Sequence, residues 1–201
     1  RDLHSFPTRR SSDLVVVASI VVIFLTCGAM FGANDVAVVA FAAELGQKSA
    51  AGAALAAWAA GSFLAALAYG SRSWGWPLWK QLAAGALALA LGASTFTVAP
   101  NLAVLSALYA LTGLAIAPTI TSGNNIVQVT VAPSQLTEGL AWVSTALNIG
   151  VSLGSMVAGR VLDASGSRGG YLLVAGFAWT GAAVAAGSNY QIGRASCRER
   201  V

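Results

Sequence analysis

The sequence predicts an all-α membrane protein with six membrane-spanning helices. Of its 201 residues, 57% are hydrophobic and only 9% are charged, against about 25% charged in an ordinary soluble domain. Six apolar segments meet or approach the roughly 20 residues that a helix needs to cross a bilayer. Lipid permits only helices or closed barrels, and runs such as residues 15–25 lack the period-two polarity of barrel strands. The segments are therefore predicted to be helices.

Polar and turn-forming residues set the ends of these helices. The predicted spans are residues 15–45, 50–69, 82–98, 102–131, 137–162 and 170–187. Gly, Pro, Ser or Asn interrupts the apolar pattern in each intervening break, and such residues favour turns. These breaks are residues 46–49, 71–81, 99–101, 132–134 and 164–169.

The break at residues 71–81 carries Trp74, Trp76 and Trp79 between Arg72 and Lys80. Clustered tryptophans are typical of a membrane–water interface, and they also suit a groove within the protein. The loops on this side of the membrane contain two basic residues, and those on the other side contain three. This difference is too small to predict the orientation of the protein in the membrane. The three are Lys48, Arg160 and Arg168.

Most of the positive charge lies in two end segments, residues 1–14 and 191–201. The net charge is +4, but residues 15–190 hold five basic and four acidic side chains. Residues 4–14 can be translated from a common short-read sequencing adapter, and residues 192–201 from its reverse complement. A targeting tail at each end would explain the arginines but not this complementarity. We therefore expect both end segments to be artefacts outside the fold, and the chain to be a fragment of a longer protein.

Few reactive groups remain between the end segments. His4, the one histidine of the chain, and Cys197 lie within them. Cys27 sits in an apolar run and is predicted to be inert packing. We expect no disulfide, metal site, cofactor or nucleic-acid partner.

Small residues at four-residue spacing in the first and fifth helices predict that these helices make close contacts with neighbouring helices. Gly28 and Gly32 form one such pair, Gly150 and Gly154 form another, and Gly159 follows in the fifth helix. Such residues let backbones approach where lipid gives no hydrophobic drive for association. For any single pair, composition alone is an equally good explanation.

Polar side chains within the predicted spans are the candidates for a solute or proton pathway, because such groups are costly in lipid. Asn34 and Asp35 in the first helix are matched by Asn124 and Asn125 in the fourth. This correspondence predicts a three-plus-three inverted repeat around a midplane site. Measured from Val15, Asp35 would lie about 30 Å along the helix, which is near the far boundary of a bilayer about 30 Å thick. The alternative interpretation is therefore a carboxylate solvated at the membrane boundary. The full candidate set is Asn34, Asp35, Asn124, Asn125, Gln128 and Asn148.

The remaining charges are predicted to lie at loops and helix ends. Arg72 and Lys80 belong to the tryptophan-rich break. Glu138 falls in the first turn of the fifth helix, where the helix dipole favours an acid. Arg160 and Asp163, three residues apart at the other end of that helix, can pair locally.

Several short motifs are shared with one transporter family. On these motifs the chain resembles the carboxyl-terminal half of a bacterial major facilitator superfamily (MFS) transporter. They lie at residues 31–41, 61–62, 69–72, 117–119, 136–142, 159–166 and, most clearly, 147–159 (LNIGVSLGSMVAG).

The resemblance covers residues 15–190 and implies that the six helices are the last six of a twelve-helix bundle. Its implied function is secondary active transport of a small solute by alternating access, with proton-coupled efflux. It further implies a multi-pass protein of the inner (plasma) membrane, a missing amino-terminal six-helix half as partner, and a cytoplasmic loop around Arg72. Asp35 would then be the candidate coupling or solute-contacting carboxylate.

Two other classes of membrane protein fit parts of the sequence. A non-transporting polytopic membrane anchor or assembly subunit would have no polar cavity between the first and fourth helices. The Gly150-Val-Ser152-Leu-Gly154 run matches a Gly-x-Ser-x-Gly pattern and suggests an intramembrane serine protease. That chemistry needs a base for the serine proton, and residues 15–190 contain no histidine.

Overall fold

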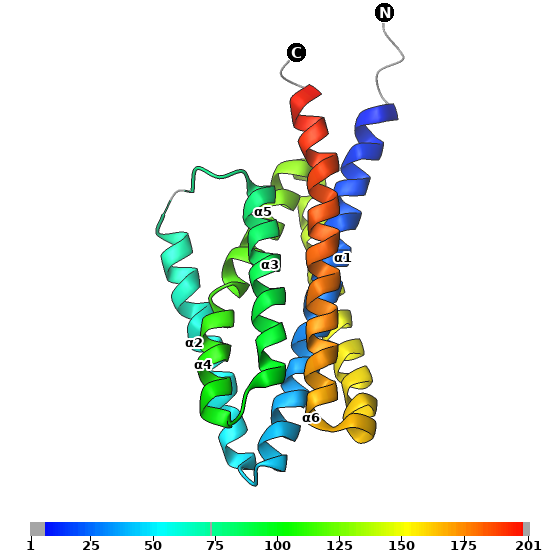
Figure 1. Ribbon diagram of the computed structural model, residues 1–201. Coiled ribbons are helices and arrows are strands. Elements are labelled where there is room, and N and C mark those ends of the chain that lie inside the picture. The colour runs from blue at the N-terminus through cyan, green and yellow to red at the C-terminus, as the bar shows by residue number, and fades with distance from the viewer. Residues whose placement is uncertain (1–6, 73, 199–201) are drawn as a thin grey trace, which may run out of the picture.

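The computed structural model describes residues 7–72 and 74–198, and side chains within residues 15–72 and 74–188. The described residues form an all-helical bundle of long, mostly upright helices (Figure 1). The helices are α1 (Pro7–Glu44), α2 (Ala51–Gly70), α3 (Leu78–Thr95), α4 (Leu102–Gly113), α5 (Ile116–Thr130) and α6 (Leu136–Arg198). Short 3-10 turns occupy Lys48–Ala50, Phe96–Val98 and Pro133–Gln135.

Four segments are long and apolar enough to cross a membrane, which is compatible with a membrane protein. Mean hydropathy is highest in the first of them, at 2.5. Three of these segments each cover a single predicted span, and the fourth covers the last two; the predicted third span, residues 82–98, is not among them. The four are Val15–Glu44, Lys48–Gly70, Leu102–Thr130 and Pro133–Ser188.

The predicted fourth span is divided in the structure. Helix α4 ends at Gly113, and the amide groups of Leu114 and Ala115 donate to the carbonyls of Leu111 and Thr112 in a tight turn before α5. Pro118 explains the break: it has no amide hydrogen to donate to the carbonyl of Leu114, and its ring crowds that carbonyl. The span from Leu102 to Thr130 therefore consists of two shorter helices.

The predicted fifth and sixth spans form the two arms of α6. Gly166 has φ 66° and ψ −170°, which is not helical, and the chain reverses direction there (Figure 1). Only glycine adopts this backbone without strain. We call residues 136–165 the first arm and residues 167–198 the second arm.

Other helix ends differ from the sequence expectation. Helix α3 starts at Leu78, directly after Pro77, so Trp79 and Lys80 belong to its first turn. At the chain ends, the backbone of α1 is already helical from Pro7 and that of α6 continues to Arg198. Parts of both end segments thus extend α1 and α6, while residues 1–6 and 199–201 lie outside the described residues.

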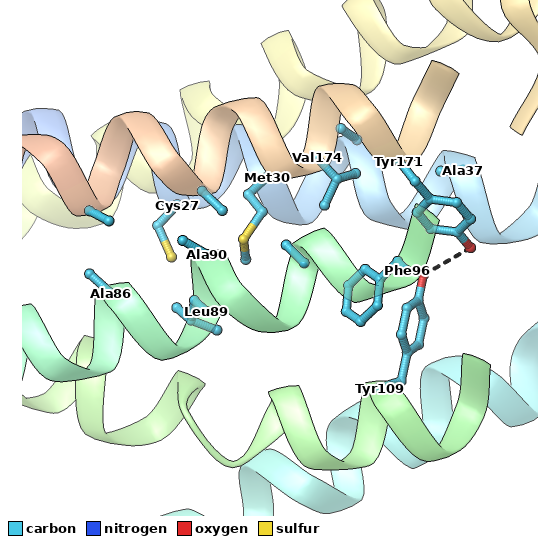
Figure 2. Packing of buried hydrophobic residues seen from close by; sticks show 14 of the residues in the cluster. Cys27, Met30, Ala37, Ala86, Leu89, Ala90, Phe96, Tyr109, Tyr171 and Val174 are labelled. Carbon is cyan, nitrogen blue, oxygen red and sulfur yellow. Dashed lines mark hydrogen bonds between the residues drawn. The ribbon is translucent and has the colours of Figure 1, made fainter. Parts of the chain in front are cut away.

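The core lies where α3 meets α1 and the second arm. Figure 2 shows Cys27 and Met30 of α1 facing Ala86, Leu89 and Ala90 of α3. Farther along, aromatic rings replace the small side chains of this core. The rings belong to Phe96, Tyr109 and Tyr171, each at most 1% exposed.

Candidate functional site

A seam of four glycines joins α1 to the first arm of α6. An added Cβ at Gly28, Gly32, Gly150 or Gly154 would clash with a backbone carbonyl oxygen of the facing helix. Those oxygens belong, respectively, to Leu147, Val151, Leu25 and Ala29. Residue numbers rise together on both sides of this glycine seam, so the two helices run parallel. Their backbones therefore approach as closely as small residues in a membrane permit.

Gly159 does not belong to the glycine seam, contrary to the sequence expectation. Nothing lies within 4 Å of a Cβ added there. It follows Gly154 by five residues, which turns it about 140° away from the contact face. The seam is instead extended by Ser155, whose hydroxyl donates to the carbonyl of Gly32 at 3.1 Å.

Asn34 is drawn into the core of the bundle rather than toward Asn124 or Asn125. It is 1% exposed, and its carbonyl oxygen accepts a hydrogen bond from the Tyr109 hydroxyl at 2.6 Å. That hydroxyl lies 3.3 Å from the Tyr171 hydroxyl, the contact drawn in Figure 2. The three side chains form a polar triad that connects α1, α4 and the second arm of α6.

Aromatic rings enclose this polar triad. The ring centre of Tyr109 lies 4.7 Å from that of Phe96 and 5.0 Å from that of Trp58. Neither Tyr109 nor Tyr171 is among the site residues predicted from the sequence. A signal was available, because a tyrosine within an apolar span needs a hydrogen-bond partner for its hydroxyl.

Asp35 points away from Asn34, as the 100° between neighbouring helical residues requires. It is exposed on the surface of the bundle. Asp35 lies about 13 Å along the helix from Glu44, where α1 ends, and about 30 Å along it from Val15. Counted from Glu44, it is close to the middle of a hydrocarbon layer about 30 Å thick; counted from Val15, it is near the far boundary, so both depths stay predictions.

Two polar side chains of the first arm lie on the same side of the bundle as Asp35. Asn148 and Ser152 are both exposed, and Asn148 donates to the carbonyl of Ser144 at 2.8 Å. Asp35 is rotated about 70° from the centre of the glycine contact face on α1; Asn148 is rotated about 110°, and Ser152 about 150°, in the opposite sense on α6. On parallel helices that face each other, opposite rotations point to one side. We call Asp35, Asn148 and Ser152 the outer polar face.

The remaining polar candidates lie on α5. Asn124 and Asn125 are half-buried, and Gln128 is exposed two residues before the helix ends at Thr130. Close by, Gly123 lies against the ring of Phe24, where an added Cβ would meet the ring. Helix α5 thus contacts α1 where Gly123 packs against Phe24.

Charged side chains gather at the two ends of the bundle. Arg72 lies over the Trp74 ring with 5.8 Å to its centre, and Lys80 over the Trp79 ring with 5.2 Å. Glu138 is in the first turn of α6, as expected. Arg160 and Asp163 are both exposed near the end of the first arm.

Glu44 has a role that the sequence did not reveal. Its carboxylate accepts hydrogen bonds from the backbone amide of Ser167, at 2.8 Å, and from the Ser167 hydroxyl, at 2.5 Å. Ser167 is the first residue after the reversal at Gly166. The carboxylate therefore caps the amino-terminal end of the second arm from a distant helix, a position that favours negative charge.

No family model, curated protein or solved structure matches the chain. Among the residues that the structure describes, there is no cluster of three or more His, Cys, Asp or Glu side chains that could hold a metal ion. The site that the geometry itself offers is the outer polar face, with the polar triad behind it.

Proposed function

We propose that the chain is one half of a secondary active transporter of the major facilitator type. In this proposal it moves a small solute across the inner membrane by alternating access, and a proton gradient drives efflux. The six crossings would be α1, α2, α3, α4 with α5, and the two arms of α6. They would pack against an amino-terminal half with six crossings of its own.

The observation that carries the proposal is the exposure of Asp35 within the apolar span Val15–Glu44. Carboxyl groups within spanning helices are rare in contact with lipid and mark solute, ion or proton pathways. Asn148 and Ser152 extend the polar surface along the first arm. A second half packed on this side would turn the outer polar face into the wall of an enclosed pathway.

The rest of the bundle supports movement of this half as one body. The glycine seam and the polar triad tie α1 to both arms of α6 and to α4. A tightly packed half can rock against its partner without changing its own interior. Asp35 would gain and lose a proton as the pathway opens to one side and then the other.

Two measurements test this function. The coding sequence upstream of residue 15 should encode six further apolar spans, and their absence would refute the assignment as a transporter half. In the complete protein, reconstituted with an imposed pH gradient, Asp35→Asn should abolish proton-driven flux. Asp163→Asn removes the same charge outside the outer polar face and should leave flux unchanged. Equal flux in both variants would remove Asp35 from the pathway, and no flux in the wild-type protein would favour a non-transporting membrane anchor or assembly subunit.

A further inference from the structure

A pocket separate from the outer polar face lies between the ends of α2, α3 and α5. Its volume is about 340 Å³, and its apolar lining includes Ala65, Ala68, Ala84, Leu114 and Pro118. An apolar cavity of roughly 150 Å³ is large enough to hold benzene. This α2–α3 pocket therefore has room for a longer apolar group.

The polar side chains around the α2–α3 pocket are already engaged with one another. The Tyr69 hydroxyl donates to the Gln81 side chain and lies 3.0 Å from the Ser122 hydroxyl. The Gln81 amide donates to the carbonyl of Trp76 at 2.6 Å, and the Trp74 indole donates to the carbonyl of Tyr69 at 3.2 Å. The part of a ligand inside the pocket must consequently be apolar.

Two basic residues neighbour residues that line the pocket. Arg72 lies 5.8 Å from the centre of the Trp74 ring, and Trp74 lines the pocket. Lys80 precedes the lining residue Gln81, and residues 70–81 contain no acid. Trp76 is 64% exposed beside them, as tryptophans at a membrane interface are. A ligand with an apolar body inside would therefore present an anionic end to Arg72 and Lys80.

We propose that the α2–α3 pocket binds one acyl chain of an anionic phospholipid, with its phosphate held between Arg72 and Lys80. The acyl chain of the lipid lies along the alanines of α2 and α3, and it reaches the turn between α4 and α5 at Leu114. Bilayer lipid is the source that fits, because it supplies an apolar chain and a phosphate at the same depth as the tryptophans. The proposal requires the helices to lie in a membrane, but it does not require transport.

Spin-labelled lipids provide the test. The full chain is reconstituted in phosphatidylcholine vesicles, and electron paramagnetic resonance measures how strongly labelled phosphatidylglycerol and labelled phosphatidylcholine are immobilised. Wild type should prefer phosphatidylglycerol. Arg72→Gln and Lys80→Gln should each lower that preference by about fivefold, the effect of one cation near an anionic headgroup. Lys48→Gln, at the opposite end of the bundle, should not change it.

Pocket occupancy is tested separately from charge. Ala84→Phe fills the α2–α3 pocket and should remove one immobilised phosphatidylglycerol per chain. Ala88→Phe adds the same ring one turn later on α3, at an exposed residue that is not part of the pocket wall, and should remove none. Equal lipid binding in the two variants would overturn the proposal, as would displacement of phosphatidylglycerol by stearate at equal concentration. If Ala84→Phe fails to fold, the two cation variants decide, because their side chains lie on the surface.

Discussion

Substitution within the glycine seam gives a quantitative test of the packing. In Gly154→Ala, the new Cβ would overlap the backbone carbonyl of Ala29, which cannot rotate away as a side chain can. Overpacking of this kind costs about 1–3 kcal/mol. The gain in helix preference from Gly to Ala, up to about 1 kcal/mol, opposes that cost. Gly159→Ala measures the gain alone, since nothing lies within 4 Å of its added Cβ.

The assay is reversible unfolding of the two variants in mixed micelles of mild detergent and sodium dodecyl sulfate. We expect Gly154→Ala to be less stable than Gly159→Ala by about 1–3 kcal/mol, because the helix preference is common to both and the clash is not. A difference below about 0.5 kcal/mol, the usual scatter of surface substitutions, would show that the helices do not touch at Gly154. The reasoning about the seam would then be refuted.

Three further predictions concern the polar triad, the topology and the chain ends. Tyr109→Phe should cost about 1–3 kcal/mol in the same assay, because Asn34 loses its buried donor, whereas Tyr171→Phe leaves that bond intact and should cost less. In a cysteine-free background in intact cells, an impermeant thiol reagent should label a cysteine at Ser165 but not one at Ser71; the reverse pattern would contradict the cytoplasmic placement of the tryptophan-rich loop. Deletion of both end segments should leave stability unchanged within error, and a clear loss would show that they belong to the fold.

Helix positions in this chain could be predicted because membrane crossings depend on local composition. A run of apolar residues bounded by Gly or Pro is visible in a short window of sequence, so the predicted spans lie close to the observed helices. Pro118 predicts an interruption of the fourth span, and the helix divides four residues earlier, at Leu114, because a proline disrupts the hydrogen bond to the residue four positions before it. The reversal at Gly166 fell within the predicted break at residues 164–169.

Side-chain partners were harder to predict, because they depend on helices that are distant in the sequence. Asn34 and Asp35 are adjacent, yet one is buried against Tyr109 and the other is exposed. Sequence predicts that they diverge, but not which of them faces inward. Likewise, the bond between Glu44 and Ser167 requires the end of α1 to meet the start of the second arm, which no local pattern reveals.

The glycine seam also constrains the order in which the protein can be assembled. Gly32 and Ser155 are joined by a hydrogen bond, although they are 123 residues apart in the sequence. At roughly 5–20 residues per second, the ribosome needs on the order of ten seconds to make the intervening segment, and during that time the glycine face of α1 has no partner. Substitutions that weaken the seam should therefore lower the yield of inserted protein through degradation of this intermediate, even where the finished bundle tolerates them.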